Sequence, residues 1–462
     1  MARYSGMDMT EGPLLGKMIR FALPLTASGV LQLLFNAADS AVVGRFTGSQ
    51  ALAAVGSNGP LINLIVTLFM GLAIGTNVLT AQALGSHNEK DLVETVHTSI
   101  VASFLFGVIL VVLGMLLARP MLNMVGSPAD VIDLAELYIK IYFLGMPSLM
   151  IYNYASAILR AVGDTRRPLF FMIISGIVNV VLNIILVVPF HMGVAGVGIA
   201  TIVSETVSAV LVMRCLIKAD ANWRFDIKKA RISKDKLLRM LKIGLPAGLQ
   251  GASFSISNIL IQSSINSFGS ITMAGNAAAA NIEGFCSVAA DGFSQAAISF
   301  TGQCFGAKKY DRIDKILILA FILTTVTSMC TCIPSYLLGR HLLTVFTDDP
   351  SVVEVGMLRL GTICIVNFIG QWMSVPNNVS RAMGYSSFPM INTIFFVCVV
   401  RVIWIMTVFR STHSLRVLYF SYPMTWFIAA VVAVIYYLHI RKKVRAADPT
   451  SGSGPKAASA SA

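Results

Sequence analysis

The sequence predicts an all-α polytopic membrane protein with twelve transmembrane helices in two pseudo-symmetric six-helix bundles, with both termini cytoplasmic. Three observations predict this fold class: a composition poor in charge, long apolar segments and an internal repeat. Hydrophobic residues make up 56% of the 462 positions and charged residues 12%, whereas a soluble domain usually carries about 25% charged residues. A soluble fold would lack the polar groups to cover its surface, so we expect a lipid bilayer as the surroundings.

Twelve mostly apolar segments are long enough to cross a bilayer, which takes roughly 20 residues. Their ranges are 18–44, 52–80, 95–117, 134–158, 168–190, 194–217, 240–268, 276–304, 316–338, 354–380, 388–409 and 416–440. Pro24 and Pro246 lie early in the first and seventh spans. Because a proline removes a backbone hydrogen bond and kinks a helix, both are hinge candidates, with static curvature as the alternative. Residues 1–16 do not resemble a signal peptide, so we expect the first span to be an uncleaved insertion signal.

Lys and Arg are concentrated on one side of the predicted membrane. With a cytoplasmic N-terminus, the other basic residues are cytoplasmic, and the exceptions are Arg45, Arg119, Arg340, Arg410 and Arg416 outside and Lys140, Arg359 and Arg401 within spans. The richest segment, 218–242, is interpreted as a cytoplasmic linker and topology anchor, with binding to anionic lipid headgroups as the alternative. Although the net charge is +13, this distribution indicates a membrane surface rather than nucleic acid.

The second half of the chain repeats short motifs of the first half, and the two members of each pair are 221 residues apart. The pairs are Arg160-Ala-Val-Gly163 with Arg381-Ala-Met-Gly384, Gln82-x-x-Gly85 with Gln303-x-x-Gly306, and Gly71 with Gly292. Each copy spans six helices, so both copies enter the membrane from the same side. We therefore predict an N-terminal lobe over 1–222, a C-terminal lobe over 223–445 and a flexible tail over 446–462. Parallel repeats are a recurrent transporter design; duplication that only built a larger bundle is the alternative.

Polar residues inside the first six spans converge on one depth. Asp39 in span one is the clearest functional candidate, because an ionisable residue in a span is costly. Asn183 in span five and Thr201 in span six reach a similar depth, and Asn179 lies one turn from Asn183. A carboxylate among amide and hydroxyl oxygens suits Na+ or a proton relay, so these four are predicted to bind the cation; packing hydrogen bonds between helices are the alternative. Glu205, one turn from Thr201, is a further relay or cavity candidate.

The last six spans carry a different set of polar residues. Five are candidates for a relay or for the lining of a cavity: Glu283, Asp291, Gln371, Trp372 and Arg401. Arg401 lies deep in span eleven and needs a partner or water. Glu283 and Asp291 are its candidate counter-charges, although the sequence does not pair them.

Several chemistries have no support in the sequence. The seven cysteines lie mostly in apolar stretches without metal-ligand spacing, so they are interpreted as reduced apolar residues. No phosphate-cradling Gly-x-x-x-x-Gly-Lys loop, His-Glu-x-x-His motif or serine nucleophile elbow occurs. We therefore expect no enzyme and no cofactor, with transport energy supplied by an ion gradient or by the substrate's own gradient.

Several motifs together resemble one known family over about residues 12–440. They are Pro24 with Asp39 and Val43-Gly44, Ala81-Gln82-x-x-Gly85 with Gly302-Gln303-x-x-Gly306-Ala307, Leu159-Arg160-Ala-Val-Gly-Asp-Thr165, Asn179-x-x-x-Asn183, and Gly193-x-x-Gly196-x-x-x-Ala200-Thr201. The chain resembles the MATE (multidrug and toxic compound extrusion) family. The resemblance implies two lobes around a V-shaped cavity and export of organic cations and drugs in exchange for Na+ or H+. It also implies that Asp39, Asn179, Asn183 and Thr201 match the N-lobe cation site.

The chain departs from the family pattern at two places. Some members carry an acid at the position of Asn183, so its absence leaves H+ and Na+ both open. Other members place acids in spans seven and ten, where this chain has Phe254 and Gly370-Gln371-Trp372. We therefore expect no C-lobe cation site of that kind.

The sequence thus predicts a cation-coupled exporter, working as a monomer in the inner membrane of a bacterium on small organic cations or drugs. The alternative is a flippase for a lipid-linked saccharide or cell-wall precursor. Such a protein would need a cationic cavity for a pyrophosphate, and Arg401 is the only arginine that the sequence places clearly inside the membrane.

Overall fold

The computed structural model describes residues 6–47, 49–125 and 131–447, and these contain helices and no strand. This confirms the predicted all-α class. The helices of the first half are α1 (Leu14–Phe46), α2 (Ser49–Gly85), α3 (Glu89–Val125), α4 (Ile132–Leu144), α5 (Met146–Ala161), α6 (Arg166–Val187) and α7 (Gly193–Ile217). Those of the second half are α8 (Lys234–Asn266), α9 (Ser270–Gly306), α10 (Tyr310–Leu337), α11 (Gly339–Thr344), α12 (Pro350–Arg359), α13 (Asn367–Ala382), α14 (Ser387–Asn392), α15 (Val400–Trp404), α16 (Arg410–Thr412) and α17 (Leu415–Ala447).

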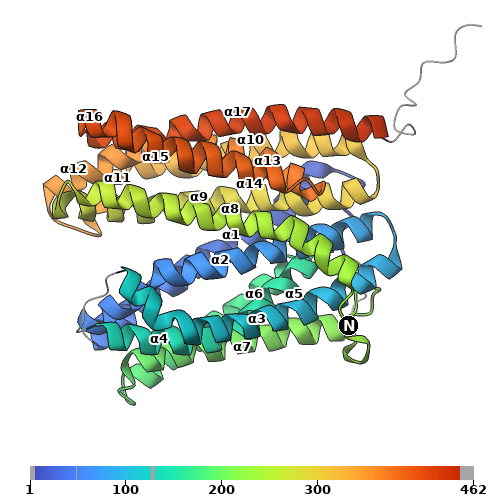
Figure 1. Ribbon diagram of the computed structural model, residues 1–462, viewed down its shortest axis with the longest axis horizontal. Helices are drawn as coiled ribbons and strands as arrows, with labels where there is room; N and C mark the ends of the chain where they lie inside the picture. The colour runs from blue at the N-terminus through green and yellow to red at the C-terminus, as the bar shows by residue number, and fades with distance from the viewer. Residues whose placement is uncertain (1–5, 48, 126–130, 448–462) are drawn as a thin grey trace, which may run out of the picture.

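The helices form two bundles that meet along four of their members. In Figure 1, α3–α7 lie on one side of the molecule and α10–α17 on the other, with α1, α2, α8 and α9 between them. The principal contacts between the bundles join α2 to α8 and α1 to α9. The boundary predicted at 222/223 stays a prediction. The segment between α7 and α8 contains the short 3-10 helix η1 (Ile227–Lys229) and ends at Lys234, and most of the predicted tail lies outside the described residues.

The predicted spans correspond to these helices. Among the described residues, nine helices are long and apolar enough to cross a membrane, and α4 with α5 makes a tenth span that is bent by 46°. The other two are α8 and α9, which have 33 and 37 residues. They are less apolar because each presents polar side chains to the cavity described below. Together these make the twelve spans of the predicted fold class.

Three spans depart from the single regular helix that apolar runs predict. Span four breaks at Gly145, where a Cβ would lie 2.9 Å from Oε2 of Glu205 and where Pro147 follows without a backbone donor. Spans ten and eleven contain π-helical segments: η2 (Leu360–Cys364), η3 (Thr393–Val399) and η4 (Ile405–Phe409). Such segments are rare and often occur at functional sites.

The repeated glutamine–glycine motifs hold the two bundles together. Nε2 of Gln82 on α2 donates to the carbonyl of Ala382 on α13, and Nε2 of Gln303 on α9 donates to the carbonyl of Ala161 on α5, each at 2.7 Å. A Cβ on Gly85 would lie 2.0 Å from the Gln303 carbonyl oxygen, and one on Gly306 would lie 2.1 Å from that of Gln82. We name Gln82, Gly85, Gln303 and Gly306 the cytoplasmic latch. Only glycine allows the backbones to approach this closely.

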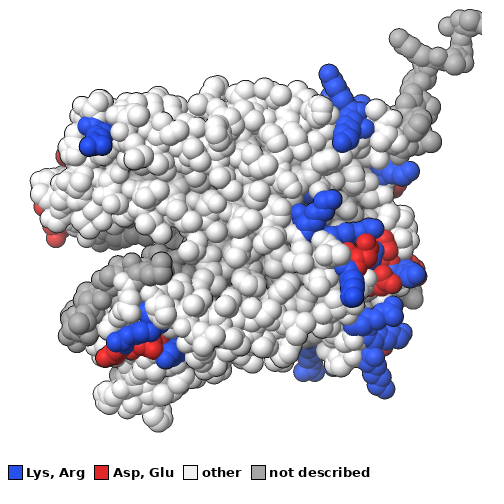
Figure 2. Space-filling model, in the orientation of Figure 1, with Lys and Arg blue, Asp and Glu red and all other residues white. Residues whose placement is uncertain are grey.

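The N-terminal segment covers the latch. The backbone N–H of Met9 donates to Oε1 of Gln303 at 3.0 Å, and Nε of Arg312 donates to the Met9 carbonyl at 2.9 Å. Met9 itself is fully buried. Most Lys and Arg side chains in Figure 2 gather at the end of the molecule where α17 ends. By the positive-inside rule this end is cytoplasmic, so the latch closes the cytoplasmic side.

The two hinge-candidate prolines lie inside continuous helices. Pro24 is within α1 and Pro246 is within α8. In each helix the carbonyl three residues before the proline accepts a hydrogen bond from a side-chain hydroxyl. The Thr165 hydroxyl donates to the Phe21 carbonyl at 3.0 Å, and the Ser386 hydroxyl donates to the Ile243 carbonyl at 2.6 Å. Thr165 and Ser386 are equivalent positions of the repeat. Their role as bending points stays a prediction.

The latch can be tested by adding one methyl group. Gly306→Ala should lower the unfolding temperature in detergent, because overpacking costs about 1–3 kcal/mol. Gly284→Ala on the same helix is the matched control, since its Cβ would meet nothing within 4 Å. That control should leave stability unchanged or raise it by up to about 1 kcal/mol, the helix preference of alanine over glycine. Equal unfolding temperatures for the two variants would contradict the close approach of the lobes.

Candidate functional site

Three of the four predicted cation-binding residues form one hydrogen-bonded cluster in the first lobe. Nδ2 of Asn183 on α6 donates to Oδ1 of Asp39 on α1 at 2.5 Å and to Oδ1 of Asn179 at 3.2 Å. Asn183 is 1% exposed, and its Oδ1 is buried without a hydrogen-bond partner. We name Asp39, Asn179 and Asn183 the N-lobe cluster. A carboxylate and two amide oxygens in a partly buried setting can accept a proton or ligate a small cation.

Thr201 and Glu205 lie on α7, next to the helices of the cluster. The Thr201 hydroxyl donates to the Val197 carbonyl of its own helix at 3.0 Å, so its oxygen retains acceptor capacity only. Glu205 lies against Gly145, at the break between α4 and α5. Tyr138 and Tyr142 of α4 are near enough to interact electrostatically with both Asp39 and Glu205.

A cavity of about 890 Å³ lies between the two lobes. Its walls come from α1, α2, α5 and α6 on one side and from α8, α9, α12, α13 and α17 on the other. The cleft in Figure 2 opens at the end opposite to the main group of Lys and Arg. Its volume is in the range of pockets that hold small molecules. With the latch closed, the cavity faces outward.

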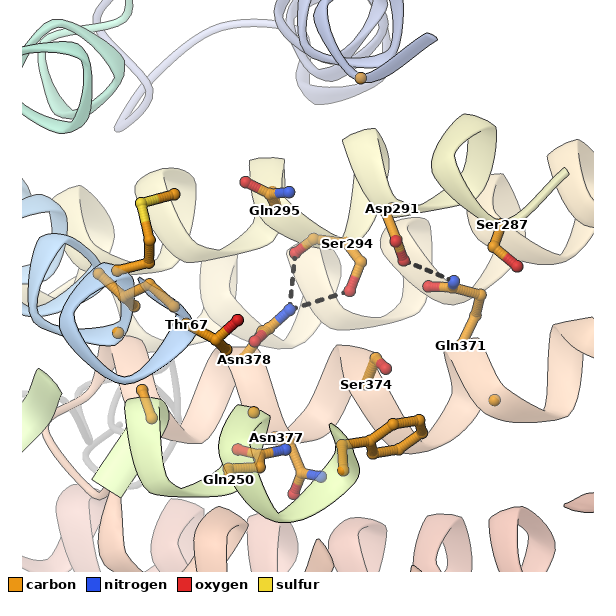
Figure 3. A pocket seen from close by; sticks show the side chains of 18 of the residues that line it. Thr67, Gln250, Ser287, Asp291, Ser294, Gln295, Gln371, Ser374, Asn377 and Asn378 are labelled. Atoms are coloured by element: carbon orange, nitrogen blue, oxygen red, sulfur yellow. Dashed lines mark hydrogen bonds between the residues drawn. The ribbon is translucent and has the colours of Figure 1, made fainter. Parts of the chain in front are cut away.

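One wall of the cavity carries a row of polar side chains. Nε2 of Gln371 on α13 donates to Oδ1 of Asp291 on α9 at 2.8 Å, and Nδ2 of Asn378 donates to Oγ of Ser294 at 2.9 Å (Figure 3). Further toward the cytoplasm, Arg381 donates to Oδ1 of Asn378 at 2.9 Å and to Oε1 of Gln250. Of the C-lobe residues that the sequence singled out, Glu283, Asp291 and Gln371 line this cavity.

Trp372 and Arg401 are not among the residues that line the cavity, so of the two roles predicted for them only that of a relay stays a prediction. Nε1 of Trp372 donates to the Thr325 hydroxyl of α10 at 2.8 Å. Arg401 is fully buried, donates to Thr425 at 3.0 Å and has its guanidinium carbon 4.2 Å from the centroid of the Tyr422 ring. A π-helical segment precedes Arg401 and another follows Trp404, so a regular helical wheel does not give the direction of this side chain.

The pairing of the charged residues that the sequence left open is settled at Glu283, whose partner is Arg359. Arg359, at the end of α12, donates through Nη2 to Oε2 of Glu283 at 2.8 Å and through Nη1 to Oδ1 of Asn276 at 2.7 Å. The side chains of Arg359 and Glu283 are only 9% and 13% exposed. No salt bridge to Arg401 occurs among the described residues. The sequence places Arg359 in a span, but which acid faces it depends on the packing of α12 against α9.

The cavity contains more basic groups than the sequence indicated. Arg160, Arg359 and Arg381 all line it, whereas Arg401, the arginine that the sequence singled out as intramembrane, does not. Arg160 and Arg381 are equivalent positions of the repeat, and both lie at the cytoplasmic end of their helices. The signal was present in the repeated Arg-Ala-x-Gly motif, but its direction toward a cavity is set only by the pairing of the lobes.

The N-lobe cluster and the cavity are separate, and α1 belongs to both. No residue of the cluster is among those that line the cavity, whereas Leu25, Ser28, Gly29 and Gln32 of α1 are. Asp39 follows Gln32 by seven residues, which is about two helical turns. A change of bonding at Asp39 therefore acts on a helix that forms part of the cavity wall.

Comparisons with known proteins agree with this architecture. The family model described as MatE matches residues 24–185 and 246–407. The probable multidrug resistance protein YoeA of Bacillus subtilis (strain 168) is 27% identical over 436 residues, covering 92% of this chain and 94% of the relative. The probable multidrug resistance protein NorM of Thermotoga maritima is 27% identical over 390 residues and 82% of each chain. The FAD transporter of Shewanella oneidensis is 25% identical over 354 residues, covering 75% and 77%.

Solved structures share the fold. A crystal structure of a MATE protein in complex with MaL6 has a TM-score of 0.89 at 22% identity, covering 96% of this chain and all of the other. A transporter of the MOP superfamily from Pyrococcus furiosus has the same TM-score and coverage. The two matched segments of the family model cover more than half of the chain. This protein is therefore a multi-pass transporter of the cell membrane, the inner membrane in bacteria, and belongs to the MATE family of multidrug efflux transporters.

Proposed function

We propose that this protein is a cation-coupled antiporter that exports small organic cations and drugs by alternating access, in exchange for H+ or Na+. The observation that carries the proposal is the partly buried hydrogen bond between Asn183 and Asp39, which lies on α1, a helix that also lines the cavity. The proposal includes no cofactor besides the coupling ion. It also includes action as a monomer, since one chain supplies both the cluster and the cavity walls.

Coupling follows from what Asp39 can bind. An ionised carboxylate accepts hydrogen bonds only, whereas a protonated one also donates. Protonation therefore weakens the bond from Asn183 Nδ2 and offers a donor to the buried amide oxygens. Na+ would act on the same atoms by drawing Asp39, Asn179 and the unpartnered Oδ1 of Asn183 toward itself. In either case the ion changes how α1 is held against α6, and a ligand shifts a conformational equilibrium only through such a difference between states.

Substrate binding follows from the charges and rings of the cavity. Arg359 neutralises Glu283, so Asp291 is the acid in the described lining that has no cationic partner. Tyr422 and Trp426 present aromatic rings in the same cavity, and aromatic faces attract organic cations. A cation seated near Asp291 would therefore gain a charge partner and an aromatic surface while the rest of the molecule contacts apolar side chains.

The coupling role can be tested in proteoliposomes with a fluorescent cationic drug and imposed gradients. Asp39→Asn should reduce gradient-driven transport to the level of empty vesicles while the unfolding temperature stays near that of the wild type, because the amide keeps the shape but loses the charge. Asp133→Asn is the control, since that acid is 82% exposed in a surface ion pair with Arg119. Imposing Na+ and pH gradients separately identifies the coupling ion. Normal transport by Asp39→Asn would exclude this mechanism.

The substrate role predicts a charge-specific effect at Asp291. Hydrogen bonds to charged groups contribute about 1.5–3 kcal/mol, so Asp291→Asn should weaken the apparent affinity for a monocationic drug by about tenfold or more. A neutral substrate of similar size should be affected little. Concentration dependence of transport by wild type and variant measures both. An equal loss for both substrates would indicate a structural role for Asp291.

A second candidate function is a flippase for a lipid-linked saccharide or cell-wall precursor of the same superfamily. Arg160 and Arg381 in the cavity favour it, and Nε of Arg381 is buried without a partner. Arginine forks suit pyrophosphate, and one relative is named as a transporter of FAD, which contains that group. The test is complementation of a flippase-deficient strain with wild type and with Arg160→Gln/Arg381→Gln. If the protein exports drugs, the wild type should not rescue the strain. Rescue by the wild type that is lost in the double variant would favour the flippase.

A further inference from the structure

Three cysteines that are far apart in the sequence meet inside the second lobe. Cys286 lies on α9, Cys332 on α10 and Cys364 at the end of η2, and their sulfur atoms all lie within 4.8 Å of one another. All three are buried, with exposures of 3%, 0% and 0%. The sequence showed no metal-ligand spacing for these residues; the grouping arises only from the packing of three segments. We name them the three-thiol cluster.

The surroundings of the three-thiol cluster are apolar and organised. Its neighbours in the core include Ala279, Ile282 and Leu360. Hydroxyl groups form an outer shell, with Ser335 Oγ 3.4 Å from the Cys286 sulfur and Thr331 Oγ1 3.9 Å from that of Cys332. Cys364 is brought to the cluster by a π-helical segment whose backbone bond joins Ile365 N–H to the Leu360 carbonyl at 3.2 Å. Because π-helical segments often mark functional sites, the backbone supports a role beyond filling space.

The number and spacing of the sulfurs fit one central, three-coordinate soft ion. Bonds of about 2.3 Å from a centre to three thiolates place the sulfurs about 4 Å apart or closer. Soft thiolate ligands select soft ions. Zn²⁺ prefers four ligands, and no fourth His, Cys, Asp or Glu belongs to the described group.

Charge decides between the soft ions. The site is buried in apolar surroundings, and an uncompensated charge there is costly. Glu283, one turn before Cys286, is already neutralised by Arg359. Three thiolates leave a net charge of about −2 around a monovalent ion and about −1 around a divalent one, whereas a trivalent centre gives a neutral complex.

From this geometry we infer that Cys286, Cys332 and Cys364 form a binding site for a trivalent thiophilic metalloid of the arsenite class. The reaction with arsenous acid is As(OH)₃ + 3 RSH → As(SR)₃ + 3 H₂O. Three S–H and three As–O bonds break, three As–S and three O–H bonds form, and neither arsenic nor sulfur changes oxidation state. Both the incoming molecule and the product are neutral, so no charge has to be buried.

A metalloid bound to the three-thiol cluster would join α9, α10 and η2 of the second lobe. Cys286 directly precedes Ser287 and lies five residues before Asp291, both of which line the cavity, and Cys364 precedes α13, which carries Gln371. The metalloid would therefore restrain two walls of the cavity against α10. This site is separate from the N-lobe cluster and does not depend on the proposed coupling ion or substrate.

Binding can be measured on the purified, reduced full-length chain in detergent after anaerobic removal of the reductant. Sodium arsenite is the probe, and the number of arsenic atoms per chain is measured by elemental mass spectrometry after gel filtration. The wild type should retain one arsenic per chain, and arsenite should raise its unfolding temperature. Cys364→Ala should weaken binding by at least about tenfold, since even the loss of an outer-shell group costs a metal site 10–100-fold.

Matched controls separate this site from general thiol chemistry. Cys330→Ala removes an exposed thiol two positions from Cys332, and Cys304→Ala removes a buried thiol that hydrogen-bonds to the Met9 carbonyl instead. Both should bind arsenite as the wild type does. The triple variant Cys286→Ala/Cys332→Ala/Cys364→Ala should bind none, with its unfolding temperature in the absence of arsenite confirming a folded protein. No retained arsenic in the wild type, or undiminished binding by the folded triple variant, would overturn the inference.

Discussion

The close approach of the two lobes at their cytoplasmic ends sets the geometry of the rest of the molecule. Gly85 and Gly306 allow backbone to touch backbone, and Gln82 and Gln303 each reach across to a carbonyl of the other lobe. Because the lobes are joined at one end, they diverge toward the other, and the space between them becomes the cavity. The latch is reciprocal, so each copy of the repeat supplies both the glycine and the glutamine that the other copy needs. A single motif, duplicated, therefore closes one side of the membrane.

Within this frame the two lobes have different chemistry. The first lobe pairs a partly buried Asp39 with two buried asparagines away from the cavity, whereas the second lobe lines the cavity with a row of amides, acids and arginines. Helix α1 packs against α6 of its own lobe and against α9 of the other. A change in the bonding of Asp39 is thereby transmitted to the wall that a substrate would contact. In the proposed antiport mechanism, this helix would join the ion-binding region to the substrate-binding region.

The buried charges of the second lobe show why its polar residues are not equivalent. Arg359 is satisfied by Glu283 and Asn276, and a buried ion pair with such additional hydrogen bonds can offset its desolvation. Arg401 instead rests on the Tyr422 ring and bonds to Thr425, away from the cavity. This leaves Asp291 and the pair Arg160 and Arg381 to determine the polarity that a substrate meets, with the acid and the bases at different depths.

The sequence by itself determined the properties that depend on composition, period and spacing. Apolar run length, loop charge and the repeated motifs were enough for the twelve spans, the membrane orientation and the two-lobe architecture, because lipid imposes the same requirement on every span. They were also enough to select Asp39, Asn179 and Asn183, since a polar residue in a span stands out against its neighbours. Tertiary structure alone decided which side chains meet. The pairing of Glu283 with Arg359, the exclusion of Trp372 and Arg401 from the cavity, and the meeting of three distant cysteines depend on helix breaks, π-helical turns and interhelical packing. Helix breaks and π-helical turns rotate the side chains that follow them, so a regular helical period does not predict the direction in which those side chains point.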